Sequence, residues 1–264
     1  MPSLDAPNAG PAPSLGATPA LAKTTVAPLP LAASARLLSV PSDRPLLGLT
    51  LLLVEDSRLS SEGMRLLCLR SGARLRRADS LQAAERHLKA FRPNVAVVDL
   101  GLPDGSGLDL IRQLAQARPR IDAIIATSGD DSLEEEARAA GACAFIAKPI
   151  ASLAAFQAAI LSGLSLDRTP RGPRALPEGV VHPDPVALRD DLGHAAEILA
   201  RGDGPGLDYV AQFLRGVAKG ARDEALTQAT GALRAARAEG GNGQGEAGDL
   251  AAVLIDRLAL APVT

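Results

Sequence analysis

The middle of the chain, from residue 46 to about residue 166, alternates between short apolar runs and stretches in which apolar residues recur every three or four positions. Runs of the first kind are typical of strands buried in a parallel sheet, and stretches of the second kind are typical of amphipathic helices. We therefore predict five strands, at residues 46–54, 73–78, 95–99, 121–126 and 142–147. Five helices are expected to follow them in turn, at residues 57–70, 81–91, 108–117, 132–140 and 152–164.

Local signals indicate where several of these helices begin and end. Ser57 and Ser80 precede two of the helical stretches, and a serine at that position accepts a hydrogen bond from an otherwise unpaired amide of the first turn. Gly72 and Gly141 follow two of them, as is common at helix ends. The second strand, 73–78, contains three arginines, which favours a place at the edge of the sheet.

Alternating strands and helices are typical of a doubly wound α/β fold with a parallel sheet. Parallel strands bring their carboxyl ends to one edge of the sheet, where ligands bind in such folds. Polar residues follow four of the five predicted strands. They are Glu55, Asp56, Asp99, Thr127 and Lys148. We therefore expect three acids, one hydroxyl and one lysine to converge on one small site.

A lone aspartate at the end of a strand is more often a turn or cap residue than a functional one. The prediction of a functional site therefore rests on the five residues together. Three carboxylates at close range repel one another unless a cation lies among them. Oxygen ligands without histidine or cysteine suit Mg²⁺ or Mn²⁺. A divalent ion, an ammonium and a hydroxyl donor together suit phosphoryl transfer, in which an aspartate can serve as nucleophile and form an aspartyl-phosphate.

The segment from Leu46 to about Ser165 resembles the receiver domain of two-component response regulators. The resemblance rests on an acid pair after the first strand, an aspartate after the third, a threonine after the fourth and a Lys-Pro pair after the fifth. It implies a flavodoxin-like (βα)₅ fold with strand order 2-1-3-4-5. It also implies that Asp99 accepts a phosphoryl group from a histidine kinase or a phosphotransfer protein, with Mg²⁺ (or Mn²⁺) bound.

The resemblance further implies how the metal is held. Asp56 would bind the ion directly, Glu55 would act largely through water, and the backbone carbonyl of Gly101 would be another ligand. Asp99 itself would also contact the metal. The family often has two aspartates where this chain has Glu55 and Asp56, and metal binding remains the expectation with this common variant.

Thr127 and Lys148 would contact the phosphoryl group, and Phe145 matches the position of an aromatic switch residue that acts together with the threonine. Pro149 matches a Lys-Pro bond that receiver domains commonly hold in cis. The segment after Thr127 is about one residue shorter than in the family, so Ser128 competes with Thr127 as the hydroxyl donor. Simple packing in the core is an equal interpretation of Phe145.

The two ends of the chain differ from its middle. Residues 1–45 contain nine prolines and ten alanines with no aromatic residue, which predicts a disordered tail. Residues 167–184 are rich in proline, arginine and glycine and are predicted to be a linker. Residues 185–264 are predicted to be a helical region that forms a small antiparallel bundle. Its expected helices are 185–200, 207–219, 221–239 and 249–260.

Charge argues against nucleic acid as a partner. The whole chain has a formal net charge of −2, and residues 175–264 contain eight basic and thirteen acidic residues, a net charge of −5. A DNA-reading domain needs a basic face, so a DNA-binding regulator is disfavoured. His194 lies in the middle of a predicted helix near an acid, where a phosphotransfer histidine could lie. A solvated or packed helix histidine is favoured, because the basic and glycine neighbours of phosphotransfer domains are missing.

The last helix of the α/β segment has an unusual composition, since no charged residue occurs from Pro149 to Leu166. We expect this helix to be covered by the C-terminal region or by a second subunit, because exposed apolar surface usually marks an interface. The alternative is an exposed helix that is merely rich in alanine. A homodimer through this helix or through the C-terminal helices is among the expected partners.

The sequence predicts a cytoplasmic protein without a membrane partner. Cys68 and Cys143 lie in apolar surroundings, which favours reduced thiols. No apolar run is long enough to span a membrane, and no signal-peptide pattern begins the chain.

Three functions remain open at this stage. The first is a phosphorylation-driven switch of protein interactions, and the second is a phosphorelay intermediate or phosphate sink. The third and weakest is a DNA-binding regulator. None of them makes the protein an enzyme beyond its own phosphorylation and dephosphorylation.

Overall fold

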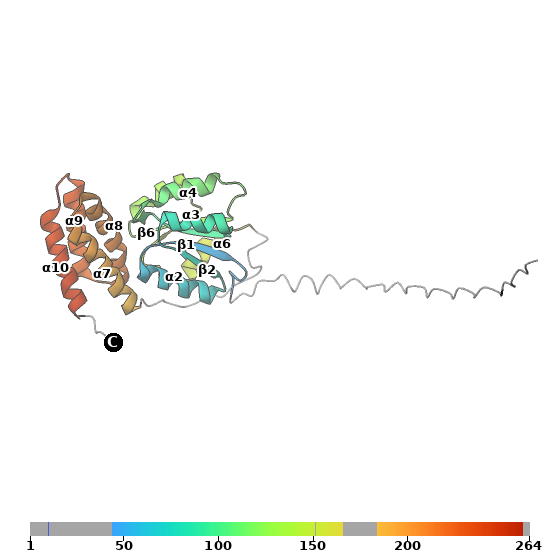
Figure 1. The fold of residues 1–264 in the computed structure, drawn as a ribbon, viewed down its shortest axis with the longest axis horizontal. Helices are drawn as coiled ribbons and strands as arrows, with labels where there is room; N and C mark the ends of the chain where they lie inside the picture. Colours follow the sequence, from blue (N-terminus) through green and yellow to red (C-terminus); the bar gives the residue numbers. More distant parts are fainter. Residues whose placement is uncertain (1–9, 11–43, 151, 166–183, 261–264) are drawn as a thin grey trace, which may run out of the picture. The chain divides into compact units, whose positions relative to one another are not determined.

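Five parallel strands form one sheet in the order β2-β1-β3-β6-β7 (Figure 1). They are β1 (Thr50–Val54), β2 (Arg74–Ala78), β3 (Val95–Asp99), β6 (Ala123–Ser128) and β7 (Ala144–Ala147). This order confirms the predicted 2-1-3-4-5 arrangement, since β6 and β7 are the fourth and fifth strands of the sheet.

The computed structural model describes residue 10 and residues 44–150, 152–165 and 184–260. Apart from residue 10, all of these belong to one unit that spans residues 39–264. The predicted tail, residues 1–45, and the predicted linker, residues 167–184, lie almost entirely outside the described residues.

Helices cover both faces of the sheet (Figure 1). They are α2 (Arg58–Ser71), α3 (Leu81–Ala90), α4 (Gly107–Gln116), α5 (Glu134–Ala140) and α6 (Leu153–Gly163). Leu67 of α2 and Phe156 of α6 lie in the core on one face, whereas Ile111 of α4 and Ala137 of α5 lie in the core on the other. The central strand β3 is buried along its whole length, because it has helices above and below it.

The predicted helix signals are confirmed. The hydroxyl of Ser57 accepts a hydrogen bond from the amide of Ser60, and Ser80 caps α3 in the same way. Helices α2 and α5 end at Gly72 and Gly141. Strand β2 lies at the edge of the sheet, as its arginines indicated.

Two local features differ from the prediction. The first strand begins at Thr50 rather than at residue 46, because residues 45–48 form a turn in which Gly48 has a φ of +86°. A short hairpin follows β3 directly and was not predicted. It consists of β4 (Gly101–Leu102) and β5 (Gly105–Ser106).

The C-terminal region is a four-helix bundle, which confirms the predicted all-helical region (Figure 1). Its helices are α7 (Pro185–Arg201), α8 (Gly204–Ala221), α9 (Glu224–Ala238) and α10 (Gln244–Leu260). Each helix packs against two others, and the shared core includes Val210, Leu214, Leu233 and Leu250. The connections are short, as is typical of antiparallel neighbours. In the described parts of the chain, no helix is long and apolar enough to cross a membrane.

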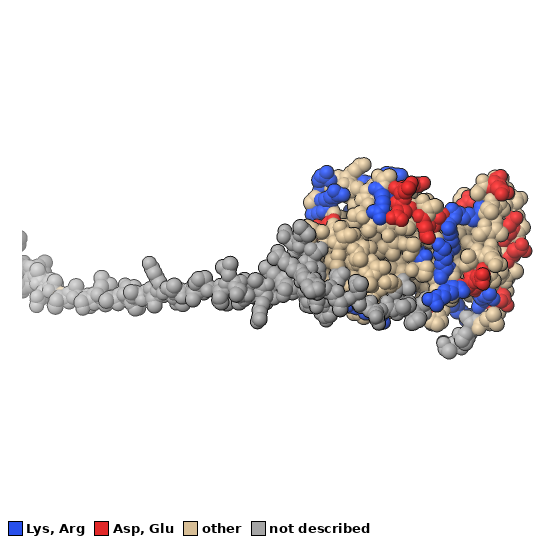
Figure 2. Space-filling model, turned by 180° about the vertical axis from the view of Figure 1, so that it is seen from behind, with Lys and Arg blue, Asp and Glu red and all other residues tan. Residues whose placement is uncertain are grey.

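Helix α6 packs on α2, β6 and β7. The positions that it exposes hold small residues, Ala155, Ala158 and Ser162. Figure 2 shows a broad surface of the α/β domain without Lys, Arg, Asp or Glu. Among the described residues the bundle packs mainly on α2 and β4, and these three positions of α6 stay exposed, so the expectation that the C-terminal region covers α6 is wrong for this part of the chain. The alternative of an exposed, alanine-rich helix agrees with the structure, and coverage by a second subunit stays a prediction.

The bundle is attached to the α/β domain at the beginning of α2. Leu59 of α2 lies in the apolar core of the bundle. Asp191 of α7 is buried, and its carboxylate accepts hydrogen bonds from the Ser57 hydroxyl at 2.7 Å and from the amides of Arg58 and Leu59 at 2.8 and 3.1 Å. A carboxylate at the N-terminus of a helix is stabilised by the unpaired amides and by the helix dipole. Asp191 therefore caps α2 from a distant part of the sequence.

We expect Asp191→Ala to lower the free energy of unfolding by about 1–3 kcal/mol, because the hydroxyl and amides that it caps lose a buried partner. The neighbouring substitution Asp190→Ala is the matched control. Asp190 forms only an exposed ion pair with Arg58, so its loss should cost less than about 1 kcal/mol. Urea denaturation of the full chain measures both values, and equal losses in the two variants would contradict the capping role.

Candidate functional site

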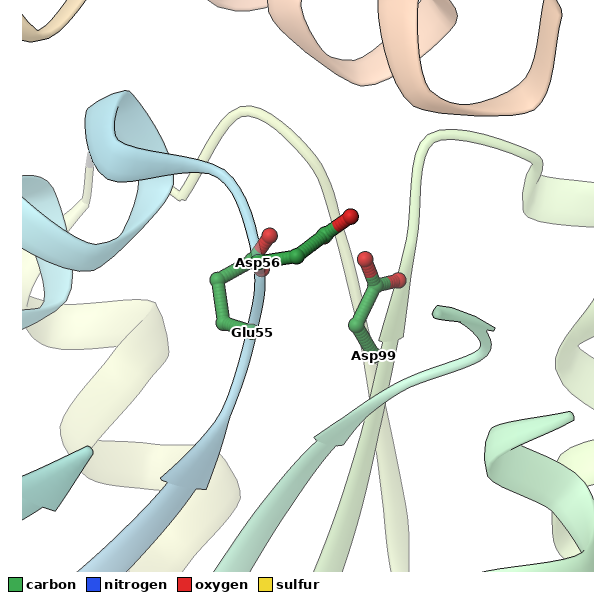
Figure 3. A group of neighbouring side chains, drawn as sticks. All are labelled: Glu55, Asp56 and Asp99. Atoms are coloured by element: carbon green, nitrogen blue, oxygen red, sulfur yellow. The ribbon is translucent and has the colours of Figure 1, made fainter. Parts of the chain in front are cut away.

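Three carboxylates meet at the carboxyl edge of the sheet (Figure 3). Glu55 and Asp56 directly follow β1, and Asp99 is the last residue of the neighbouring strand β3. One oxygen atom from each carboxylate lies within 4.8 Å of the other two. The structure therefore brings together the three acids that the sequence predicted to converge.

Lys148 follows β7 and reaches into the same group. Its Nζ lies 2.7 Å from Glu55 Oε2 and 2.7 Å from Asp99 Oδ2, and its side chain is only 7% exposed. One ammonium among three ionised carboxylates leaves a net charge of −2 in a largely buried site. Such an excess is costly, because few water molecules remain to screen it.

The pKa values respond to this crowding. Burial raises the pKa of Glu55 well above its ordinary value, although the charge of Lys148 opposes the shift. Burial and the charge of Asp99 raise the pKa of Asp56 to about 6. Burial alone would lower the pKa of Lys148, but the charges of Asp99 and Glu55 outweigh it and raise that pKa. The site thus favours the uptake of positive charge.

The donor set fits a hard divalent cation such as Mg²⁺ or Mn²⁺. All the side-chain donors are carboxylate oxygens, which these ions prefer. Asp56 Oδ1 is buried and has no hydrogen-bond partner among the described residues. Gly101, whose carbonyl was predicted as a ligand, begins β4, and its amide lies 3.4 Å from Asp99 Oδ1.

The hydroxyl donor was predicted as Thr127, with Ser128 as its competitor. Thr127 is fully buried, and its hydroxyl donates to the carbonyl of Ile146 at 2.9 Å. Thr127 is the register partner of Asp99 in the sheet, so their side chains lie on the same face, and the side chain of the next residue, Ser128, starts from the opposite face. Ser128 lines a small cavity together with Asp99 and Lys148. The choice between Thr127 and Ser128 as the donor to a group on Asp99 stays a prediction.

Two further predictions concern β7 and the residues after it. The Lys148–Pro149 peptide bond is cis, as the sequence predicted. Phe145 is partly buried and packs against the core beneath α3, α4 and α5, where the switch and core interpretations are equally compatible with its position. Its switch role stays a prediction.

Helix α8 lies directly over the site. The Tyr209 hydroxyl donates a hydrogen bond to Asp56 Oδ2, and the Gln212 side chain lies against Gly101. Further along the same face of the helix, Gly216 approaches the Lys148 side chain, and Lys219 Nζ donates to the Gly129 carbonyl at 2.7 Å. Residues three or four positions apart share one face of a helix, so a single stripe of α8 covers the entire group.

Small residues allow this close approach. A Cβ atom on Gly129 would lie 3.0 Å from the backbone nitrogen of Gly216, and a Cβ atom on Gly216 would lie 3.3 Å from Lys148 Cδ. The cavity that remains beneath α8 has a volume of about 10 Å³. A buried water needs roughly 10–15 Å³ on the same kind of measure. This cavity thus has room for about one water molecule.

A second contact between domain and bundle involves Asp130, which follows β6. Arg215 of α8 lies 2.6 Å from its carboxylate, and Arg234 of α9 donates to the same oxygen. This role of Asp130 was not predicted from the sequence, since an aspartate after a strand is usually solvated. Asp130 is buried because the bundle covers it.

Sequence reasoning also missed the contribution of α8. Its apolar spacing predicted one buried stripe, and nothing in the sequence singled out Tyr209, Gln212 or Gly216. The available signal was the glycine in a helix interior, which can mark a close approach of another backbone. His194 of α7 is exposed, with its ring edge-on to those of Tyr209 and Phe213.

Comparison with known proteins agrees with this geometry. Residues 51–160 match the family model of the response regulator receiver domain. The virulence transcriptional regulatory protein PhoP of Salmonella typhimurium is 30% identical over 99 residues, which cover 37% of this chain and 44% of PhoP. The KDP operon transcriptional regulatory protein KdpE of Escherichia coli is 31% identical over 98 residues, with the same coverage. The chain therefore matches less than half of the length of these relatives.

Among solved structures, a putative response regulator from Chloroflexus aurantiacus is 29% identical with a TM-score of 0.36. The similarity covers 38% of this chain and 85% of that protein. The matched family model ends before α7, so it does not include the bundle.

The raised pKa of Asp56 predicts a specific dependence of stability on pH. Because its pKa rises from an ordinary 3.8 to about 6, the folded protein binds this proton more tightly than the unfolded chain does. The contribution of Asp56 to stability is therefore most favourable at low pH and is lost as the pH rises through 6. Asp56→Asn removes the charge and keeps an oxygen for Tyr209. In EDTA the variant should unfold at a higher temperature than the wild type at pH 8.

This difference in unfolding temperature should shrink towards pH 5. Asp109→Asn, at an exposed acid, is the control and should show no such trend. A difference between Asp56→Asn and the wild type that stays constant from pH 5 to pH 8 would contradict the shifted pKa.

Proposed function

We propose that this chain, which carries a response regulator receiver domain at residues 51–160, is a phosphorylation-driven switch that releases its own C-terminal bundle. Receiver domains interact with histidine kinases or phosphotransfer proteins, and the phosphoryl group would come from such a partner. Asp99 is the proposed acceptor. The released bundle would then bind a protein partner or a second copy of the chain.

The site residues have complementary roles in this transfer. A carboxylate oxygen of Asp99 attacks the phosphorus atom, the bond between phosphorus and the donor histidine breaks, and the imidazole keeps the electron pair and takes up a proton. Lys148, 2.7 Å from Asp99, neutralises negative charge on the transferred group, and the hydroxyl of Thr127 or Ser128 donates a hydrogen bond to it. Asp56, Glu55 and the Gly101 carbonyl would hold Mg²⁺, which supplies further positive charge.

The observation that carries the proposal is the size of the cavity beneath α8. About 10 Å³ cannot hold a phosphoryl group, so phosphorylation of Asp99 and docking of α8 exclude each other. Phosphorylation of Asp99 and docking of the bundle are therefore linked equilibria. Phosphorylation weakens docking by the same free energy by which docking opposes phosphorylation. This reciprocity supports a switch.

The charge of the bundle favours a protein partner over DNA. PhoP and KdpE are named transcriptional regulators, but the match covers less than half of their length. Residues 175–264 of this chain have a net charge of −5, and DNA recognition depends on a basic surface. Release of α8 would instead expose Tyr209, Phe213 and Val217 together, a surface suited to a protein.

The second candidate is a relay intermediate or phosphate sink, in which the bundle serves only as a removable cover. In that case Asp99 would gain and lose the phosphoryl group without any new association. The oligomeric state of the full chain, measured with and without beryllofluoride and Mg²⁺, distinguishes the two functions.

The switch predicts that a larger residue at position 216 speeds phosphorylation. Gly216→Leu pushes α8 away from Lys148, whereas Gly231→Leu adds the same atoms to α9, where no atom outside the adjacent residues and backbone of that helix lies within 4 Å of the new Cβ. With acetyl phosphate and Mg²⁺, Gly216→Leu should be phosphorylated roughly tenfold faster, which corresponds to about 1.4 kcal/mol less stable docking. Intact mass spectrometry over time measures the rate. Asp99→Asn should remain unmodified.

Equal phosphorylation rates in the wild type, Gly216→Leu and Gly231→Leu would contradict the proposal that α8 covers the acceptor site. Phosphorylation of Asp99→Asn would contradict the choice of acceptor.

A further inference from the structure

Tyr209 is the single tyrosine of the chain, and it lies at the metal site. It belongs to α8 in the bundle, yet its hydroxyl donates a hydrogen bond to Asp56 Oδ2 at the edge of the sheet. The two residues are 153 positions apart in the sequence. Among the hydrogen bonds of the described residues, no other one joins a side chain of the bundle to Glu55, Asp56 or Asp99.

The contact brings no charge to a site that is short of positive charge. Glu55 and Asp99 both bind Lys148, whereas Asp56 has only the neutral hydroxyl of Tyr209 and a second oxygen without a partner in the described residues. A divalent cation among the three carboxylates would balance the remaining charge of −2. A hydroxyl donor and a cation both need electron pairs of the same carboxylate, and a cation beside Asp56 repels the hydroxyl proton.

A neighbouring residue of α8 covers the other expected ligand. A Cβ atom built on Gly101 would lie 2.4 Å from Gln212 Nε2, so the Gln212 side chain fills the space in front of this residue. Tyr209 and Gln212 are three positions apart and thus lie on one face of α8. The helix therefore covers Asp56 and Gly101 together.

We propose that Tyr209 competes with Mg²⁺ for Asp56, so that metal binding loosens α8 before any phosphoryl group arrives. This deepens the proposed function and rests on its metal site. The protein would then respond in two steps, in which Mg²⁺ displaces Tyr209 and phosphorylation of Asp99 completes the release. The bundle acts as a competitor that weakens metal binding while it is docked.

The opposite role for Tyr209 is that of a positioning residue, in which its hydrogen bond holds Asp56 ready for the metal through the free Oδ1. The two roles predict opposite effects of removing the hydroxyl. Competition predicts tighter Mg²⁺ binding by Tyr209→Phe, and positioning predicts weaker binding. Our proposal is competition.

The unmodified protein reports on the contact, because the chain has one tyrosine and no tryptophan. Tyrosine fluorescence is quenched when the hydroxyl donates to a carboxylate. Addition of Mg²⁺ to the metal-free full chain should therefore raise the fluorescence, with a midpoint equal to the dissociation constant measured by calorimetry. A flat fluorescence signal across a calorimetric binding transition would overturn the proposal.

Calorimetry on variants provides the second test. Tyr209→Phe should bind Mg²⁺ about tenfold more tightly than the wild type, since one charge-assisted hydrogen bond no longer has to be broken. The control, Thr230→Val, removes a hydroxyl of the bundle that has no hydrogen-bond partner in the described residues and should leave the affinity unchanged. Unchanged or weaker binding by Tyr209→Phe overturns competition, and so does an absence of Mg²⁺ binding in both proteins.

Failure of this proposal can be told apart from failure of the proposed function. Phosphorylation of Asp99 in Gly216→Leu at saturating Mg²⁺ depends on the acceptor site and not on Tyr209. If Asp99 is phosphorylated there while Mg²⁺ leaves the tyrosine fluorescence unchanged, the switch stands and the competition is wrong. If the fluorescence rises but Asp99 stays unmodified, the competition stands and the acceptor assignment is wrong.

Discussion

The rest of the structure depends on one electrostatic constraint, the excess of negative charge at the carboxyl edge of the sheet. Strand order brings Glu55, Asp56 and Asp99 within 4.8 Å of one another, and Lys148 balances only one of the three charges. A site with that imbalance binds positive charge, by proton uptake or through a cation. A phosphoryl group on an aspartate would add more negative charge to this site. Phosphorylation therefore requires a bound metal ion to balance that charge.

The bundle responds to this constraint by covering the site with a helix that carries no acid on the contacting face. The contacting groups of this face are the hydroxyl of Tyr209, the amide of Gln212, the backbone of Gly216 and the ammonium of Lys219. Around this face, Asp191 caps α2 and Asp130 binds arginines of the bundle, so charged groups anchor the rim. The centre is close-packed, and the cavity beside Asp99 has a volume of about 10 Å³. In the proposed switch, phosphorylation of Asp99 and docking of the bundle therefore compete for one surface.

Much of this fold could be predicted from the sequence, because its strands, helices and caps depend on local patterns. Apolar runs predicted the five strands, the resemblance to receiver domains implied their order, and Ser57 and Ser80 predicted where two helices begin. The acid group and Lys148 were also predictable, since strand ends in a parallel sheet must converge.

What the sequence could not predict depends on how the two parts meet. Asp191 looks like any surface acid of an amphipathic helix until the beginning of α2 is known to lie against it. Tyr209 belongs to a polar face whose partner is set by docking and not by periodicity. The sequence pattern alone does not decide between Thr127 and Ser128 as hydroxyl donor, because both lie at the end of β6, where Thr127 pairs with Asp99 and Ser128 lines the cavity. The short side chains of α6 explain why a helix without charges can remain uncovered by the bundle.

The most direct test of the account is amide hydrogen exchange along α8 and the first turn of α2, measured on the full chain. The amides of Arg58 and Leu59, which donate to Asp191, report on docking of the bundle. With Mg²⁺ and beryllofluoride these amides and those of α8 should exchange faster in the wild type and remain protected in Asp99→Asn. Unchanged protection in a wild-type protein whose Asp99 has bound beryllofluoride would contradict the claim that a phosphorylated site and a docked bundle exclude each other.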